Sequence, residues 1–362
     1  MRELNLKNLS SGIAQIAEQK MIPKEKVIEA IESSLAAAYK KEYGRKSEKY
    51  RMKFDKDTGN PQFFRVLKVI DENMVFKEGE TQREGKIKFN PLSHIMINEV
   101  KEKFPDKEIK AGEEIEILLP SKKDFGRIAV GVAKQTLFQK IRELERELIF
   151  SEFTKKENEI LSGIIQRKEK DTIFVDLGKT IGILLTGDQT PGEFYKLGTR
   201  LRFYCLRVER SPRGVTVYLS RNHPKFLSKL FELEVPEIAN GVVEIKAIAR
   251  EPGIRTKIAV LSKEKNIDPI GSLVGQRGTR VNAVIQELGR EKIDIILWSE
   301  KPEEFIKNAL SPAKVIGVKI RKNVAEVKIP RNQLSLAIGK NGQNIQLASE
   351  LCGWKINIIS EE

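Results

Sequence analysis

The sequence is poor in the side chains that bind metals and cross-link chains. Its 362 residues include two cysteines, Cys205 and Cys352, and two histidines. Two isolated cysteines exclude a disulfide framework and a cysteine zinc site, so both are expected to be small buried residues. We therefore expect no metal site and no cofactor.

Long hydrophobic runs are also missing. No stretch of about 18 apolar residues occurs, which excludes an ordinary membrane-spanning helix. The first 20 residues mix charges with apolar positions and do not form the apolar segment of a secretory signal. The sequence predicts a soluble, cytoplasmic monomer without a membrane partner. The length exceeds one ordinary core and predicts several small domains.

Two partial motifs fail to make a nucleotide or calcium site. The triplet at 178–180, Gly-Lys-Thr, resembles the end of a phosphate-binding loop, but Ile173 stands where the first glycine of that loop must be. Asp55 and Asp57 resemble the start of a calcium loop, but Val66 stands where its closing glutamate must be. The sequence suggests no catalytic constellation, so an enzyme is not expected.

Positive charge is what the sequence has in excess. The formal net charge is +14 and the isoelectric point is near 9.5. Lysine and arginine neutralise phosphates and release their counterions, which favours a polyanionic partner. The excess is spread along the chain, and charge alone does not identify the polyanion.

The amino-terminal third combines helical and strand patterns. Apolar residues at helical spacing begin after Pro23 and end near Gly44. Alternating patterns then predict strands at 49–54, 63–70, 73–78, 86–89 and 114–119. We expect an α+β domain over residues 1–126. A helical pattern follows at 127–156 and predicts a long connecting helix, with a helix that only caps a domain as the alternative.

Residues 157–223 have the pattern of a small β-barrel. Five short strand candidates, at 159–166, 172–177, 181–186, 201–208 and 215–220, are separated by turn residues. Alternation in the second strand places Phe174 opposite its apolar neighbours, where it could stack on a base. Tyr204, near Arg202, is a weaker candidate. Plain packing at a domain junction is the competing interpretation for both aromatics.

The last part of the chain contains an internal repeat. LVGQRGTRVNAVIQELGREKIDII at 273–296 returns, shortened, as AIGKNGQNIQLASELCGWKINII at 337–359. Gly275 and Gly339 are 64 residues apart (339 − 275), whereas Glu287 and Glu350 are 63 apart (350 − 287), so one residue has been lost. The order strand, strand, helix, loop, helix, strand is predicted twice, in domains at 224–300 and 301–362.

Each copy carries a Gly-x-x-Gly loop between two helical segments. Glycine lets a nucleic-acid backbone approach closely, and the next helix offers unpaired amides to a phosphate. The expected contact residues are Gly275, Gln276, Arg277, Gly278 and Arg280 in the first copy and Gly339, Lys340, Asn341 and Gly342 in the second. Val281, Val284, Ile285 and Ile345 are expected to line a groove for bases. Two such loops favour binding of single-stranded RNA or DNA. Because the basic side chain moves by one position, the two loops are expected to grip unequally.

The stretches 274–289, KIDIILWSEKPEEFIKNALSPAKV at 292–315 and SLAIGKNGQNIQLASELCGWKI at 335–356 carry a family resemblance. Over essentially its whole length the chain resembles the NusA family of bacterial transcription elongation and termination factors. The resemblance implies an α+β multidomain fold with a polymerase-binding domain, a long connecting helix, a five-stranded OB-fold barrel of S1 type and two tandem type II KH domains. It implies no catalysis, but binding of RNA polymerase and nascent single-stranded RNA, with effects on pausing, termination and antitermination.

The resemblance also allows other Nus factors and ribosomal proteins as partners. The acidic carboxy-terminal repeats of some members are not expected here. Two other classes combine KH and S1 modules. An RNA-processing exonuclease would need grouped metal-binding carboxylates, for which the amino-terminal residues show no motif. A ribosome-associated RNA-binding protein is the third possibility.

Overall fold

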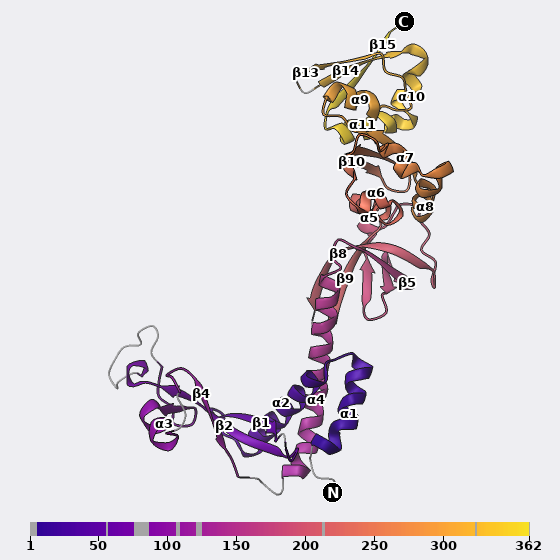
Figure 1. The fold of residues 1–362 in the computed structure, drawn as a ribbon. Coiled ribbons are helices and arrows are strands. Elements are labelled where there is room, and N and C mark those ends of the chain that lie inside the picture. Colours follow the sequence, from indigo (N-terminus) through magenta and orange to yellow (C-terminus); the bar gives the residue numbers. More distant parts are fainter. Residues whose placement is uncertain are drawn as a thin grey trace. The chain divides into compact units, whose positions relative to one another are not determined.

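A computed structural model gives the architecture of the chain (Figure 1). The structure describes residues 6–55, 57–75, 87–105, 109–120, 125–211, 214–322 and 324–361. The chain divides into two compact units, Met1–Leu148 and Ile149–Glu362.

Helices of the first unit pack on a small sheet. α1 spans Leu6–Lys20, α2 spans Lys24–Tyr43 and α4 spans Phe125–Thr154. The helical spacing predicted after Pro23 is confirmed, because α2 buries Val27 and Leu35 on one face against the sheet residue Met52. α4 confirms the long helix predicted after this domain. Its residues up to Leu148 belong to this unit.

The sheet of the first unit is built around one strand. β2 (Pro61–Ile70) pairs antiparallel with β1 (Lys49–Phe54) and β4 (Glu114–Leu118), and parallel with β3 (His94–Met96). A short helix, α3 (Ile97–Lys103), follows β3. The carboxylate of Asp55 accepts the Thr58 N–H at 2.8 Å in the turn between β1 and β2. This hydrogen bond explains the Asp-rich turn without a calcium ion.

Two strand predictions in this unit need correction. The first of these candidates, 73–78, starts in a 3₁₀ turn that spans Glu72–Met74. The next residue, Val75, makes an isolated bridge to Ile87 and is not part of a strand. The remaining positions of the candidates at 73–78 and 86–89 lie partly outside the described residues. β3 and α3 were not predicted, since elements of three and seven residues are too short to show a clear period.

The second unit begins with a closed five-stranded barrel, as the sequence predicts. Its strands are β5 (Ile160–Glu169), β6 (Thr172–Asp176), β7 (Ile181–Leu184), β8 (Arg200–Ser211) and β9 (Gly214–Ser220), in the order β5-β6-β7-β9-β8. Cys205 lies inside the barrel, where burial raises its thiol pKa to about 12. That thiol is therefore an unreactive packing residue, as predicted.

The repeat folds twice into the same α+β arrangement. The first copy contains α5 (Pro224–Glu234), α6 (Pro236–Ala239), β10 (Val243–Glu251), β11 (Arg255–Ser262), α7 (Pro269–Val274), α8 (Thr279–Glu287) and β12 (Lys292–Leu297). The second contains α9 (Pro302–Ala309), β13 (Gly317–Arg321), β14 (Val324–Pro330), α10 (Leu334–Ile338), α11 (Gln343–Cys352) and β15 (Lys355–Glu361). In each sheet the middle strand is antiparallel to the first strand and parallel to the last.

The two copies of the repeat confirm the predicted order of strands and helices and the type II KH fold. Each copy also begins with helical structure that the strand-first prediction left out. We call the copies the first repeat unit (residues 224–300) and the second repeat unit (residues 301–362).

The residue lost between the copies corresponds to Glu291. Arg290 and Trp354 both close the preceding helix by donating their N–H to the carbonyl five residues earlier, and they are 64 residues apart (354 − 290). Lys292 and Lys355 both begin the last strand and are 63 apart (355 − 292). The slip therefore lies after the helix, and not before Glu287 as the sequence comparison suggested.

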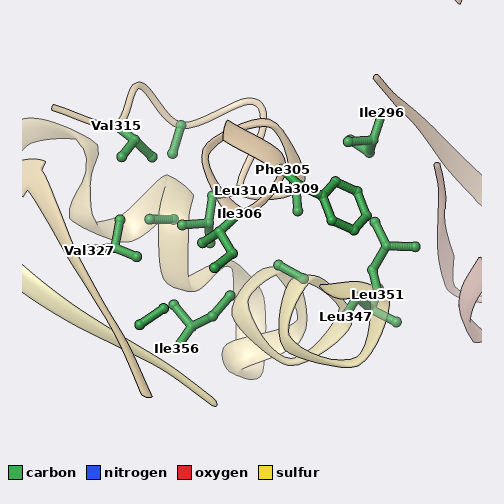
Figure 2. Packing of buried hydrophobic residues seen from close by; sticks show 14 of the residues in the cluster. Ile296, Phe305, Ile306, Ala309, Leu310, Val315, Val327, Leu347, Leu351 and Ile356 are labelled. Carbon is green, nitrogen blue, oxygen red and sulfur yellow. The ribbon is translucent and has the colours of Figure 1, made fainter. Parts of the chain in front are cut away.

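Helices of the second repeat unit cover the sheet of the first. Ala249, Ala259 and Ile296 of the first sheet share one buried cluster with α9 and α11. Figure 2 shows Phe305 and Leu351 on the side of this cluster where Ile296 lies. Small alanine side chains let the helices approach the strands closely. Within the described residues, no helix is long and apolar enough to cross a membrane.

Candidate nucleic-acid interface

The two Gly-x-x-Gly loops have the same backbone geometry. Gly275 has φ 70° and ψ 176°, and Gly339 has φ 74° and ψ 174°. Gly278 and Gly342 both have φ 78° and lead directly into α8 and α11. Three dihedral angles thus repeat within a few degrees across copies that share little sequence between the glycines. The repeat preserves the shape of the loop and lets its side chains vary.

The first glycine of each loop is required by both angle and space. Its φ/ψ region is open almost only to glycine. A Cβ at Gly275 would lie 2.8 Å from Cγ of Arg280, and a Cβ at Gly339 would lie 2.8 Å from Cβ of Asn344. Around Gly342, by contrast, a Cβ would meet nothing within 4 Å. The second loop therefore leaves open space at the start of its helix, where a phosphate could approach the amides.

Arg280 and Asn344 occupy corresponding positions, five residues after the first glycine, and hold the loops closed. Arg280 Nη1 donates to the Ser272 carbonyl at 2.7 Å and pairs with Glu237 Oε2 at 2.9 Å. Asn344 is fully buried, and its Nδ2 donates to the Leu336 carbonyl at 3.2 Å. The charge of Arg280 is neutralised by Glu237. The structure thus places Arg280 in the support of the loop, and its predicted contact with RNA stays a prediction.

Arg277 and Lys340 project from the loops as exposed cations, and Gln276 and Asn341 are exposed beside them. Arg277 has φ 52°, a left-handed conformation that costs a non-glycine residue about 1–2 kcal/mol. Asn341 has the corresponding φ of 54°, which asparagine tolerates better. The first loop therefore keeps its arginine in a strained position.

Three of the four apolar residues predicted to line a groove behind the loops reach the surface. Val284 is 1% exposed and belongs to the core of the first repeat unit, so it cannot contact a base. Val281, Ile285 and Ile345 are partly exposed and remain at the surface. Helical spacing alone did not separate the face of α8 that meets the core from the face next to the loop.

Phe174 lies on the outer face of the barrel, as the alternation in its strand predicts. Ile173 and Val175 are fully buried, whereas Phe174 is partly exposed. The guanidinium of Arg167, its cross-strand partner in β5, lies 4.1 Å from the ring centroid. A guanidinium over an aromatic ring forms a flat cationic surface of the kind that nucleobases stack on. The sequence alone does not place Arg167 there, because only strand pairing brings it to Phe174.

Tyr204 does not lie on this surface. It is 1% exposed, its ring stacks on His223 at 5.1 Å between centroids, and its hydroxyl donates to Asn158 at 2.8 Å. The stacking prediction for Tyr204 is therefore wrong, and the alternative of packing at a domain junction holds. Arg202 is partly exposed, but its guanidinium lies 3.4 Å from the Glu234 carboxylate, which offsets its charge.

Comparison with known proteins identifies the family. Models of the NusA N-terminal domain, the NusA-like first KH domain and the NusA-like second KH domain match residues 8–147, 221–298 and 302–362. The transcription termination/antitermination protein NusA of Bacillus subtilis is 42% identical over 98% of this chain and 91% of its own length. The chain belongs to the NusA family. NusA proteins of Halalkalibacterium halodurans and Thermus thermophilus are 40% and 38% identical, each over 97% of this chain and over 87% and 89% of their own lengths.

In this member of the NusA family, a buried arginine joins the barrel to the first repeat unit. Arg221, at the end of β9, is 1% exposed. It donates to Glu193 of the barrel at 2.6 Å and to both the carboxylate and the carbonyl of Glu287, at the end of α8, at 2.9 and 2.5 Å. Burial opposes its charge, but the two glutamates hold the pKa of Arg221 above its usual value.

The extra residue of the first KH unit makes a second buried ion pair. Glu291 is fully buried and accepts from Arg250 Nε and Nη2, both at 2.9 Å, and from the Gly253 N–H at 2.8 Å. Arg250 Nη1 also donates to the carbonyls of Asn222 and His223 between barrel and KH unit. Arg221 and Arg250 thus both connect the barrel with the first repeat unit.

Neither junction was predicted, because the partners are far apart in sequence. The supporting role of Asn344 could have been predicted from the sequence, since Asn344 aligns with Arg280 when the glycines of the two copies are superposed. Among the side chains that the structure describes, no three His, Cys, Asp or Glu residues gather as a metal site.

Proposed function

We propose that this chain acts as a transcription termination/antitermination factor that holds nascent single-stranded RNA while bound to RNA polymerase. The observation that carries the proposal is the pair of Gly-x-x-Gly loops with matching dihedral angles, each next to an exposed cation. Loops of this type clamp about four nucleotides of backbone in KH domains. The relatives' common name, transcription termination/antitermination protein, supports the same role.

Within this proposal the parts of the chain have different tasks. Residues 1–126 dock on polymerase, residues 127–156 connect, and residues 157–223, 224–300 and 301–362 bind RNA. Gly275, Gln276, Arg277, Gly278, Gly339, Lys340, Asn341 and Gly342 approach the RNA backbone. Phe174 offers a stacking surface, Arg280 supports the first loop, and Arg202 and Arg280 remain candidate RNA contacts. Other Nus factors and ribosomal proteins are further candidate partners.

The decisive experiment tests polymerase and RNA together. Purified chain is added to core polymerase transcribing a template with a pause site and an intrinsic terminator, and pause lifetime and readthrough are measured. The proposal expects a change in both, and expects loss of the effect when residues 1–126 are removed. RNA binding by the remaining chain should persist. An unchanged transcription pattern together with no polymerase pull-down would refute the proposal.

The same preparation decides between the rival classes. Magnesium-dependent loss of labelled RNA would indicate an exonuclease and overturn the non-catalytic role. Co-sedimentation with ribosomal subunits without polymerase binding would indicate a ribosome-associated protein.

A further inference from the structure

A fully buried lysine connects the sheet of the first repeat unit to the second repeat unit. Strand pairing places Lys257 of β11 next to Ala249, which belongs to the buried cluster shared with α9 and α11, so both side chains point toward those helices. Lys257 Nζ donates to Asp294 Oδ2 at 3.1 Å within the sheet. It also donates at 2.9 Å to the carbonyl of Ser311, which follows α9. One side chain therefore links the two repeat units.

The end of α9 is a suitable place for a cation. The last carbonyls of a helix lack partners within the helix and carry partial negative charge. Burial lowers the pKa of Lys257, whereas the Asp294 carboxylate favours its charged form. At the matching place of the second sheet, Glu326 pairs with Asn357 as Lys257 pairs with Asp294. Of these two matching positions, the one with the cation is therefore in the sheet that the second repeat unit covers.

The carbonyl next to that of Ser311 supports the second Gly-x-x-Gly loop. It belongs to Leu310 and accepts from Asn344 Nδ2 at 3.1 Å. The same nitrogen donates to the carbonyls of Leu336 and Ala337, in the helix that leads into the loop, at 3.2 and 3.1 Å. Asn344 itself lies in the first turn of α11, the helix that follows the loop. Both sides of the second loop are thus tied to the segment that Lys257 holds.

The first loop is supported from within its own repeat unit. Arg280, which occupies the position of Asn344, pairs with Glu237 of α6 and donates to the Ser272 carbonyl. The two loops therefore share a backbone geometry but are supported from different places.

We propose that Lys257 is a positioning residue for RNA binding, which holds the second Gly-x-x-Gly loop in its phosphate-gripping conformation through Ser311, Leu310 and Asn344. We call these four residues the loop brace. The brace rests on the proposed function, because it serves a loop that is proposed to hold RNA. Lys257 is fully buried and does not touch RNA itself. The second repeat unit is therefore an incomplete clamp without the sheet of the first.

The brace acts through a shared hydrogen-bond donor. The amide nitrogen of Asn344 has two N–H groups for three carbonyls, so a shift of one carbonyl changes the bonds to the others. Without Lys257 the Ser311 carbonyl can turn to water, and residues 310–311 are free to move. The Leu310 carbonyl then moves away from Asn344, and the ends of both helices around the loop lose their common anchor.

Lys257→Met removes the brace with little other change. Methionine fills the space of the lysine stem without a charge or a donor. Asp294 keeps a partner, because Arg255 Nε and Nη2 donate to its two carboxylate oxygens at 2.8 and 3.1 Å. The variant is therefore expected to fold.

The test compares Lys340→Met in two full-length backgrounds, the parent chain and Lys257→Met. Binding of an unstructured RNA of about twelve nucleotides is measured between about 50 and 200 mM salt. In the parent, Lys340→Met should reduce the slope of log affinity against log salt by about 0.7, the value for one phosphate contact on a single strand. In Lys257→Met the second loop no longer grips phosphate, so Lys340→Met should reduce the slope by less than half as much.

Two matched variants separate the brace from a general loss of fold or charge. Arg277→Met, in the first loop, should reduce the slope equally in both backgrounds, because that loop is supported by Arg280. Lys263→Met removes an exposed cation just after β11, and its charge is paired with Glu244. In the Lys263→Met background, Lys340→Met should keep its full effect on the slope.

Amide hydrogen exchange tests the brace without RNA. The N–H groups of Gly339 and Gly342 are hydrogen-bonded within the second loop region, as are those of Gly275 and Gly278 in the first. Lys257→Met should speed exchange in the second loop about 5-fold, the weight of one hydrogen bond, and leave the first loop as in the parent. Asn344→Leu removes the other end of the brace and should give the same pattern, which keeps the test valid if Lys257→Met fails to fold.

The outcomes separate the brace from the proposed function. Equal effects of Lys340→Met on the slope in the parent and in Lys257→Met would refute the brace and leave the proposed function standing. If Lys257→Met diminishes the contributions of Lys340 and Arg277 alike, it acts on the whole fold and its positioning role is refuted. If the parent chain binds no RNA, both fail. If the brace pattern is found but the chain leaves transcription unchanged, the brace stands and the proposed function fails.

Discussion

Arg277 and Asn341 occupy the same left-handed position of their loops, with φ of 52° and 54°. Asparagine adopts this conformation readily, whereas arginine does so at a cost in folding free energy. Strained residues persist where the surroundings over-determine them, and they cluster at ligand sites. Lys170 and Lys322 have a φ of 51° in other turns, so we propose the phosphate-binding role of Arg277 from its exposure on the loop together with this strain.

Arg277→Asn should separate stability from binding. We expect the free energy of unfolding of the compact unit formed by residues 149–362 to rise by about 0.5–1 kcal/mol, because the left-handed strain is reduced. RNA affinity should fall, and the slope of log affinity against log salt should decrease by about one charge. Denaturant titration and filter binding measure the two effects.

Asn341→Arg is the reciprocal control, with lower stability and higher affinity expected. A less stable Arg277→Asn variant would contradict the assignment of strain.

Gly275→Ala and Gly342→Ala test the steric difference between the loop glycines. Both replace a glycine at positive φ, but only the first places a Cβ 2.8 Å from Arg280 Cγ. We expect Gly275→Ala to lower the free energy of unfolding by about 1–3 kcal/mol more than Gly342→Ala does. Thermal unfolding of both variants measures the difference. Equal losses of unfolding free energy would show that the Arg280 side chain moves away from the new Cβ at no cost.

Arg280→Met tests whether Arg280 supports the loop or binds phosphate. Because its guanidinium is paired with Glu237 and the Ser272 carbonyl, the variant should weaken RNA binding through loop disorder and leave the salt slope nearly unchanged. Arg277→Met, which removes an exposed cation from the same loop, is the matched comparison and should lower the slope. A loss of slope for Arg280→Met would restore the direct phosphate contact predicted from sequence.

Arg221→Leu should destabilise the junction between barrel and first KH unit. The substitution leaves the carboxylates of Glu193 and Glu287 without their buried partner, which costs about 3–5 kcal/mol. Lys263→Ala breaks an exposed pair with Glu244 and should cost less than about 1 kcal/mol. Urea titration of both variants measures the difference, and similar small losses would mean that the junction relaxes around the vacancy.

Acid should weaken the second unit through His223. Burial, together with the charge of Lys225, lowers the pKa of His223 below its ordinary value of 6.5. Its Nδ1 accepts the Lys225 N–H at the start of α5, which a protonated ring cannot do. Unfolded chains bind the proton first, so the free energy of unfolding should fall as pH drops through 6.5 and level off below the folded pKa.

His223→Asn should cap α5 without titrating and should remove this part of the pH dependence. Unfolding curves between about pH 7.5 and 5 measure it, and an unchanged slope in the variant would assign the effect elsewhere.

Local pattern predicts the local elements well and the side-chain partners poorly. The barrel strands and both loops follow from alternation, helical spacing and glycine position, all of which act over a few residues. Phe174 was predicted to face outward for the same reason. Tyr204 was not predicted correctly, because α5 covers its side of the strand: Phe203 and Cys205 face the barrel core, whereas Tyr204 packs in another cluster with Phe226 and Leu230.

Pairings between distant residues could not be predicted. Nothing near Arg280 in the sequence indicates Glu237, and nothing near Arg221 indicates both of its glutamates. The pairing of Glu291 with Arg250 could not be predicted for the same reason. The copies showed that one residue was missing, but only the structure shows that the extra residue holds a buried arginine.

The outer face of the second repeat sheet limits how the stacking of these units can continue. In the first sheet, Ala259 pairs with Ile296 under the helices of the second repeat unit. At the matching place of the second sheet, Lys328 pairs with Ile359. Beside them, Lys319 pairs with Glu326. A contact between two different surfaces can propagate from molecule to molecule into an open-ended filament. A neighbouring molecule's helices would have to desolvate these charges to add to the row of units. Packing helices against this charged face would therefore cost more free energy than packing them against the alanine-lined face of the first sheet.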